Sequence, residues 1–313
     1  MYTAGIHHIT AIASDPLRNV AFYSEVLGLR LVKRTVNFDD PASYHLYFGD
    51  NIGTSGSILT FFSWPDASRG AAGSTEVAAI SFAVPPDAID FWKERLAAHR
   101  VSAEEIAPRL GEAVVRFRDP DGLSLEFVAP ADPLAVEPWN GGAIPMEQAI
   151  RGFAAPTLAV RRADLTERVL AQILGFRFTM EEGNRRRFEA GESSAAARVD
   201  VVSSDAAPAR IAVGSVHHIA VRAADDEEQL RWRDEWIGVG FHVSPVMDRN
   251  YFHSIYFREP SGILFEIATD GPGFAIDEPL EALGTSLKLP PAFEPMRAEI
   301  ERVLPPLERA AAA

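Results

Sequence analysis

The sequence predicts an α+β protein of four βαβββ units, arranged as two tandem similar halves with curved mixed sheets. An internal repeat is the first observation behind this prediction: FRDPDGLSLEFVAP and FREPSGILFEIATD begin 140 residues apart, at Phe117 and Phe257. VLGLRL and ILGFRF form a second matching pair further upstream. The second observation is that strand-like and helix-like periodicities recur in the same order twice within each half. The four predicted units lie near 5–64, 75–129, 152–203 and 214–269.

The first unit shows the order of its elements most clearly. The run IHHITAIA from Ile6 is strand-like, and an amphipathic helix follows it. Asp15 can accept hydrogen bonds from the free amides at the start of this helix, Pro16 suits its first position, and Gly28 can end it. Three strand-like runs complete the unit: LRLVKRTVNF, SYHLYFG and SILTFFSW.

The other units repeat this order, with helices predicted over Asp87–His99, Asp164–Leu174 and Asp225–Ile237. The turns RDPDG and REPSG join the last two strands of their units as hairpins. A proline-punctuated tail follows the fourth unit, with one further helix predicted around Ala292–Val303.

The repeat also predicts where the chain divides. Residues 131–151 are rich in proline and contain two consecutive glycines, which is typical of a linker. We therefore expect an N-terminal domain of two units over 1–130, a C-terminal domain of two units over 152–270, and a tail over 271–313.

Composition limits the classes of partner. The chain has 44 acidic and 30 basic residues, a net charge of −14, so it should repel nucleic acid and anionic membranes. The absence of cysteine excludes disulfides, thiolate metal ligands and thiol nucleophiles. No apolar run approaches 18 residues and the first residues do not resemble a secretory signal, so we expect a cytoplasmic protein without a membrane span.

Two histidine pairs and one carboxylate are the candidate metal ligands. The pairs His7-His8 and His217-His218 lie at the starts of predicted strands, where neighbouring side chains face opposite sides. Glu266 lies between apolar residues in ILFEIA, and an ionised carboxylate there needs a partner or a metal. Two histidines with one carboxylate form the usual mononuclear ferrous ligand set, so the sheets would form a metal-holding cleft. The alternation of side chains along a strand does not show which histidine of each pair faces the cleft. The alternative to metal binding is that these histidines have a purely structural role.

The two halves differ at these positions. Ala78-Ala79 stands where the second half has its histidine pair, and no histidine occurs near 154–157, opposite the first pair. Glu266 does have a counterpart, Glu126. The sequence therefore predicts one metal site per chain, built from the first and fourth units, with Glu126 as a relic or a structural salt-bridge partner.

The motifs resemble those of a known family. GIHHITAIASDPLRNVAFYSEVLGLRLVKRTVNFDDPASYHLYFGD, GTSGSILTFF, GSVHHIAVR and SGILFEIATDGPGF resemble ring-cleaving dioxygenases of the vicinal oxygen chelate superfamily, in the branch that cleaves hydroquinones. The resemblance covers nearly the whole chain. It implies cleavage of a hydroquinone-type or catechol-type diol by O2 at a mononuclear Fe(II), with Mn(II) as the alternative metal. The oligomeric state is left open by the sequence, and a homo-oligomer is one alternative. It also implies the metal ligands His8, His218 and Glu266.

The resemblance further implies five residues around the metal. His7, His217 and Tyr256 would serve catalysis, and Thr10 and Arg249 would bind substrate. On regular strands the two histidines would point away from the metal. The alternatives are that they orient neighbouring groups or that they only satisfy backbone atoms.

Spacing supports some of these five roles. Thr10 lies two residues after His8 and so shares its strand face. Tyr256 lies ten residues before Glu266 across the REPSG hairpin, which makes the two near cross-strand neighbours. The phenol could donate a proton to substrate, or it could be a buried hydroxyl satisfied locally. Arg249 could pair with a phenolate or carboxylate, or it could be a solvated loop charge.

Two other functions are compatible with the same fold. A glyoxalase-type isomerase or lyase typically uses four protein ligands, and the fourth would come from SILTFFSW. That run offers Thr60, Phe61 and Phe62 and no carboxylate, which favours the dioxygenase. A non-enzymatic small-molecule binding protein would not need the two histidines and the glutamate.

Overall fold

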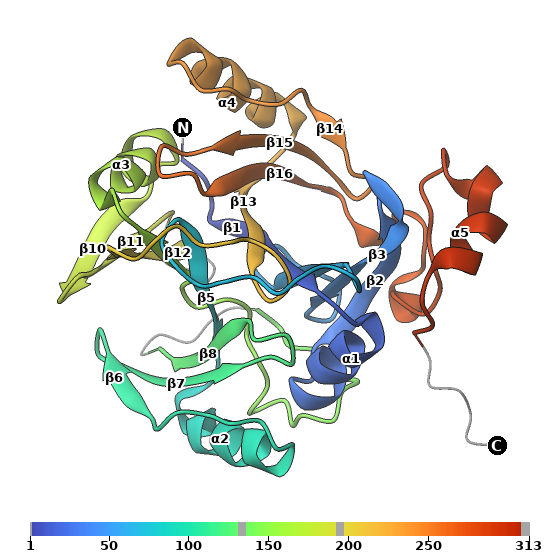
Figure 1. Cartoon of the computed structure of the whole chain (residues 1–313), viewed down its shortest axis with the longest axis horizontal. Coiled ribbons are helices and arrows are strands. Elements are labelled where there is room, and N and C mark those ends of the chain that lie inside the picture. The colour runs from blue at the N-terminus through green and yellow to red at the C-terminus, as the bar shows by residue number, and fades with distance from the viewer. Residues whose placement is uncertain (1, 131–135, 192–196, 308–313) are drawn as a thin grey trace.

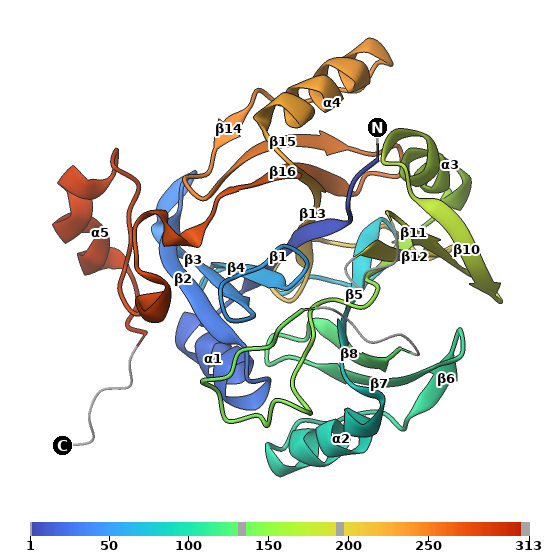
Figure 2. The same ribbon diagram turned by 180° about the vertical axis from the view of Figure 1, so that it is seen from behind.

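Two curled eight-stranded sheets form the frame of the protein, as the computed structural model shows (Figures 1 and 2). The structure describes residues 2–130, 136–191 and 197–307. The first sheet has the strand order β14-β15-β16-β13-β1-β4-β3-β2. Its strands are β1 (Ile6–Ala13), β2 (Arg30–Asn37), β3 (Asp40–Gly49), β4 (Ile58–Ser63), β13 (Val216–Ala223), β14 (Met247–Asp248), β15 (Phe252–Arg258) and β16 (Leu264–Pro272).

The second sheet repeats the arrangement with the order β10-β11-β12-β9-β5-β8-β7-β6. Its strands are β5 (Glu76–Ala83), β6 (Ala107–Arg109), β7 (Glu112–Arg118), β8 (Ser124–Ala129), β9 (Thr157–Val160), β10 (Arg177–Glu182), β11 (Arg185–Glu189) and β12 (Arg198–Ser203).

One helical segment follows the first strand of each unit, which confirms the four predicted βαβββ units. Asp15 caps the first helix as predicted, because its carboxylate accepts a hydrogen bond from the backbone N–H of Arg18. The first and third helices each continue into a π-helical turn, over Ala21–Val26 and Val169–Ile173. The α-helices are α1 (Pro16–Val20), α2 (Ile89–Ala98), α3 (Ala163–Arg168), α4 (Asp226–Gly238) and, in the tail, α5 (Arg297–Val303).

Helices cover the outer faces of the sheets, and their aromatic residues form much of the core (Figure 1). Trp92 of α2 packs on Phe127 with ring centroids 4.3 Å apart, and Trp236 of α4 packs on Phe257 at 4.2 Å. Both tryptophans are fully buried. These helices do not cover the concave faces of the two sheets (Figure 1).

The units pair crosswise rather than along the chain. β1 of the first unit pairs antiparallel with β13 of the fourth, and β5 of the second pairs with β9 of the third. Each sheet therefore takes strands from both halves. The predicted division of the chain at 131–151 stays a prediction, and residues 131–135 lie outside the described residues. The crosswise pairing brings residues of β1 next to residues of β13, about 210 positions later in the chain.

The tail lies along the first sheet at β2 and β3 (Figure 1). Lys33 of β2 is fully buried and donates hydrogen bonds of 2.6 Å to both Asp277 and Glu278. Leu287 forms a β-bridge with Arg34. The tail is thus anchored to the sheet, although residues 308–313 lie outside the described part. In the described residues, no helix is long and apolar enough to span a bilayer.

Candidate metal centre

Three side chains from three adjacent strands meet on the concave face of the first sheet. His8 lies on β1, His218 on β13 and Glu266 on β16, and each is at most 4% exposed. The two Nε2 atoms are 3.3 Å apart, and Oε2 of Glu266 lies 2.9 Å from Nε2 of His218 and 3.4 Å from that of His8. The structure thus brings together the three ligands that the resemblance implied.

The cluster fits a divalent cation. Two ligands bound at right angles at about 2.1 Å lie about 3.0 Å apart, close to the three spacings observed here. Oε1 of Glu266 accepts a hydrogen bond from Ser254, but the buried Oε2 accepts none from any residue that the structure describes. A buried carboxylate oxygen without a donor is costly, and a cation would satisfy it.

The protonation states also suit metal binding. Burial would raise the pKa of Glu266, but His8 and His218 outweigh it and hold the pKa of this carboxyl well below its usual value. Burial lowers the pKa of His218, so its imidazole is neutral at pH 7 and keeps a free nitrogen lone pair. Imidazole nitrogens and a carboxylate are the donor set expected for a mononuclear iron or manganese site.

The outer histidine of each pair contacts the inner one. Nδ1 of His7 lies 2.9 Å from Nδ1 of His8, and Nδ1 of His217 lies 2.7 Å from Nδ1 of His218. These contacts leave both inner Nε2 atoms directed at Glu266. Burial is the main cause that lowers the pKa of each outer histidine to about 3, so both are neutral at pH 7, and a neutral imidazole can accept a hydrogen bond on Nδ1. Such partners orient a ligand and set its tautomer.

Two β-bulges make these contacts possible. The register of β1 with β13 shifts between Ile6 and His8, and shifts again opposite His217. A bulge leaves one residue unpaired and turns its side chain, so neighbouring side chains need not alternate there. The outer histidines would point away on regular strands, but these strands are irregular at both pairs. Nothing in the sequence pattern signals the bulges.

Tyr256 and Arg249 form a second part of the site. Tyr256 is the cross-strand partner of Glu266, as the hairpin spacing predicted, and its ring centroid lies 5.7 Å from that of His218. The Arg249 side chain donates from Nε to the Tyr256 hydroxyl at 3.2 Å and from Nη2 to Asp39 at 3.1 Å. Arg249 is therefore a mostly buried, paired charge rather than a solvated one.

Thr10 is buried and does not line the space beside the candidate ligands, and its substrate-binding role stays a prediction. Its buried hydroxyl is hydrogen-bonded to that of Thr60 at 2.8 Å, and the Thr60 hydroxyl reaches Nε2 of His45 at the same distance. Nδ1 of His45 then contacts the Tyr47 hydroxyl at 2.9 Å. Sequence reasoning assigned no role to His45 or Tyr47. The sequence shows that the two residues lie two positions apart on one predicted strand, but it does not show which strand lies beside them.

The space beside the cluster is small. His45, Tyr47 and Phe62 line it together with the three candidate ligands, Tyr256 and Arg249, and its volume is about 30 Å³. That volume holds about two water molecules. An aromatic ring is larger, so its entry requires lining side chains to move.

The register shows which residue occupies the fourth ligand position. Thr10 of β1 pairs with Thr60 of β4, just as Ala220 of β13 pairs with Glu266 of β16. Thr60 is therefore the counterpart of Glu266 in the first unit. Because it is a threonine, the cluster offers three candidate ligands, and a metal held by them would keep coordination positions open for other molecules.

Comparisons with known proteins show what the chain is similar to. A family model described as Glyoxalase/Bleomycin resistance protein/Dioxygenase superfamily matches residues 5–127 and 152–267. MhqO of Bacillus subtilis (strain 168), whose name assigns ring-cleaving dioxygenase activity without a substrate, is 46% identical over 307 residues, 98% of this chain and 97% of its own.

Two further relatives extend the comparison. The chlorohydroquinone/hydroquinone 1,2-dioxygenase of Sphingobium indicum is 33% identical over 307 residues, 96% of this chain and 95% of its own. A crystal structure of a Bacillus subtilis protein named as a dioxygenase has a TM-score of 0.94 and 45% identity, with 98% of both chains covered.

Proposed function

The chain belongs to the Glyoxalase/Bleomycin resistance protein/Dioxygenase superfamily, and we propose that it is a ring-cleaving dioxygenase that inserts O2 into a hydroquinone-type aromatic diol. The observation that carries this proposal is the three-ligand cluster of His8, His218 and Glu266, with threonine at the fourth position. The names of the relatives support ring cleavage, and one of them supports a hydroquinone substrate.

We propose Fe(II) as the metal held by His8, His218 and Glu266, with Mn(II) as the alternative. When bound, the cation would supply Lewis acidity to the diol and a path for electrons from the diol to O2. His7 and His217 hold the two ligand imidazoles in the required tautomer through their Nδ1 contacts.

Tyr256 and Arg249 would handle the protons and charge of the substrate. Burial and the neighbouring Glu266 raise the pKa of Tyr256, so its phenol stays protonated and can donate to a substrate oxygen. Burial disfavours the charge of Arg249, but Tyr256 and Asp39 outweigh it and raise the pKa of its guanidinium. The permanent positive charge stabilises the Tyr256 oxygen when its proton is transferred.

The walls of the cavity set the position of the ring. Phe62 and Phe252 line the space beside the candidate ligands, and the Phe252 ring lies 5.1 Å from the His8 ring. Apolar walls exclude water from the reacting centre.

Opening of the ring beside a hydroxylated carbon, the extradiol type, is part of the proposal. A cytoplasmic location and a homo-oligomeric state stay predictions.

The competing functions on this fold explain the site less well. A glyoxalase-type reaction would use a carboxylate where Thr60 stands, and a binding protein would not need two buried histidines around an unsatisfied carboxylate oxygen. Both therefore rank below the dioxygenase.

Oxygen uptake tests the proposal directly. The protein is purified without oxygen, loaded with Fe(II), and given hydroquinones and catechols side by side, with His218→Ala in parallel. We expect uptake with hydroquinone that His218→Ala loses. Uptake on catechol alone would keep the ligands and change the substrate class. No uptake with either diol, at one bound metal per chain, would overturn the proposal.

A further inference from the structure

The second sheet contains a counterpart of the metal centre. Ala79 of β5 pairs with Thr157 of β9, as His218 of β13 pairs with Thr10 of β1. Ser81 pairs with Glu126, as Ala220 pairs with Glu266, so Glu126 has the position of the ligand carboxylate. Asp200 pairs with Thr157 and so has the position of Thr60.

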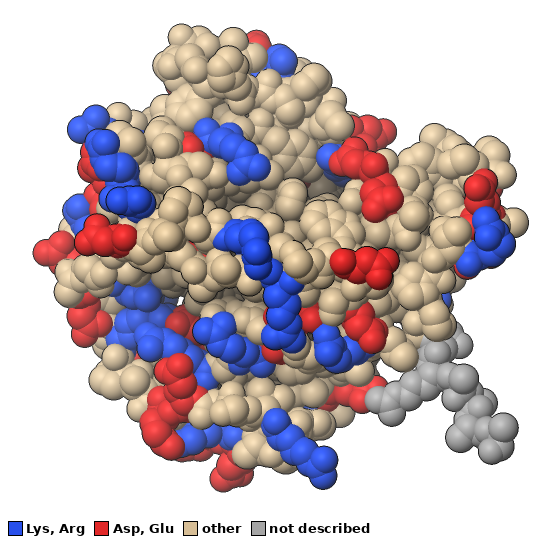
Figure 3. All heavy atoms as spheres, viewed as in Figure 1, with Lys and Arg blue, Asp and Glu red and all other residues tan. Residues whose placement is uncertain are grey.

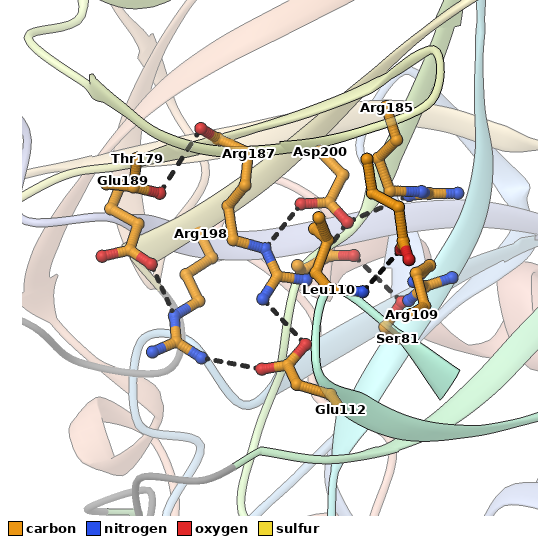
Figure 4. Close-up of polar contacts among 12 residues, drawn as sticks. Ser81, Arg109, Leu110, Glu112, Thr179, Arg185, Arg187, Glu189, Arg198 and Asp200 are labelled. Atoms are coloured by element: carbon orange, nitrogen blue, oxygen red, sulfur yellow. Dashed lines mark hydrogen bonds and ion pairs between the residues drawn. The ribbon is translucent and has the colours of Figure 1, made fainter. Parts of the chain in front are cut away.

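Arginines take the place of a metal at this counterpart site (Figure 4). Glu126 accepts hydrogen bonds from Arg109 at 2.7 Å and Arg116 at 3.1 Å, which confirms it as a structural salt-bridge partner. Asp200 accepts hydrogen bonds from Arg185 at 2.9 Å and from both Nε and Nη2 of Arg187. Both carboxylates are therefore paired without a cation from solution.

A large cavity opens beside these residues. Its volume is about 790 Å³, against about 30 Å³ beside the metal ligands. Pockets that bind small organic molecules measure about 300–1,000 Å³. Ala78 and Ala79 line it where the other sheet has its histidine pair, so small side chains leave the space that imidazole rings would fill. Figure 3 shows basic side chains, with acidic ones beside them, on the face between β10–β12 and β6–β8.

The cavity has guanidinium donors without partners, beside one weakly paired carboxylate, that of Glu104. Among the described residues, Arg185 hydrogen-bonds through Nη1 alone, to Thr157 and Asp200, which leaves Nε and Nη2 without a partner. Arg116 uses Nε for Glu126, and its Nη1 lies 3.7 Å from Glu104. Both oxygens of Glu126 already accept hydrogen bonds, from Ser81 on Oε2 and from arginines on Oε1. Burial and the charge of Arg109 lower the pKa of Arg185, as expected for a guanidinium with too little compensating negative charge.

We propose that this cavity is a second binding site, separate from the metal centre, for a small organic carboxylate. The carboxylate pairs with Arg116 and Arg185, whose planar guanidinium groups match its geometry. The apolar part of the molecule lies against Ala78, Ala79 and Val202, which line the same cavity. An aromatic acid and an open-chain unsaturated acid share this chemistry, and the experiment distinguishes them.

Calorimetric titration of the metal-loaded full chain tests the site. Benzoate is the aromatic probe, maleate the open-chain probe, and benzamide the neutral analogue of benzoate. We expect one benzoate or maleate per chain and about tenfold weaker binding of benzamide, because the charged group makes the recognising contacts. Tighter benzoate would assign the site to aromatic acids, and tighter maleate to open-chain acids.

Three variants locate the binding. Arg116→Gln should weaken carboxylate binding about fivefold, as expected for a half-exposed ion pair. Ala79→Phe should fill the cavity and abolish binding. Arg118→Gln is the matched control, because Arg118 lines the same cavity but donates to the carbonyl of Gly122.

All three variants should keep the oxygen uptake of the parent protein, because none of them changes a residue that contacts the metal ligands. Unchanged uptake with changed acid binding would separate this site from the metal centre. Equal affinity for benzoate and benzamide would overturn the proposal. So would benzoate binding that Arg116→Gln and Ala79→Phe leave unchanged, because the acid would then lie elsewhere, for example near Arg249.

Discussion

Replacement of His217 tests whether the outer histidines act through the metal ligands. Its Nδ1 lies 2.7 Å from Nδ1 of His218, so His218 can donate this proton and present the lone pair of Nε2 to a metal. Loss of such a partner typically lowers metal affinity about 10–100-fold, or about 1.4–2.7 kcal/mol. We expect that loss for His217→Ala. His217→Asn should lose less, because its amide oxygen can accept the same hydrogen bond.

The assay is an anaerobic competition titration of Fe(II) against a chromogenic chelator at pH 7. Oxygen uptake at saturating iron is measured on the same samples. His253→Ala is the matched control, because His253 also contacts a side chain through Nδ1, that of Asp226, but does not line the site. Its iron affinity should equal that of the parent protein.

Either of two results would refute this reasoning. If His217→Ala bound iron as tightly as the parent protein but lost oxygen uptake at saturating iron, His217 would act on the substrate instead of orienting His218. If both affinity and uptake were unchanged, the Nδ1 contact would have no role in the site.

Three further predictions follow from the structure. Thr60→Glu should place a carboxylate at the fourth ligand position, tighten metal binding and abolish oxygen uptake, whereas Thr60→Val should keep uptake; an active, metal-loaded Thr60→Glu enzyme would contradict the assignment of that position. Burial raises the pKa of Asp119 from 3.8 to about 6, so folding favours its protonated form and this contribution to stability is lost as pH rises from about 4 to 6. The free energy of unfolding should fall by about 3 kcal/mol through this group. Urea unfolding at pH 4 and pH 7 should show this fall in the parent protein but not in Asp119→Asn. The same pH dependence in both proteins would contradict the prediction. Lys33→Met should lower the free energy of unfolding by about 3–5 kcal/mol, because it leaves Asp277 and Glu278 without their cation. The tail should then be cut more readily in limited proteolysis, and an unchanged digestion pattern would contradict this prediction.

Local sequence patterns were enough to predict the repeated units. Hydrophobic periodicity, the Asp15 cap and the hairpin turns depend on residues close together in the chain, and the structure confirms all four βαβββ units. The hairpin spacing also placed Tyr256 opposite Glu266, because the geometry of a tight turn sets the register of its two strands.

The site itself depended on contacts that no local pattern contains. The pairing of β1 with β13 joins residues about 210 positions apart, and the bulges that turn His7 and His217 toward their neighbours arise only within that pairing. The deep position of Thr10 and the roles of His45 and Tyr47 likewise depend on which strand lies opposite.

The same limit applies to the contrast between the two sheets. The internal repeat showed alanines in place of histidines and a glutamate at position 126. Whether that exchange left a packed core or an open cavity depended on how neighbouring side chains filled the space. Side-chain packing is a property of the whole fold, so only the tertiary structure decided that Arg116 and Arg185 face a cavity of about 790 Å³.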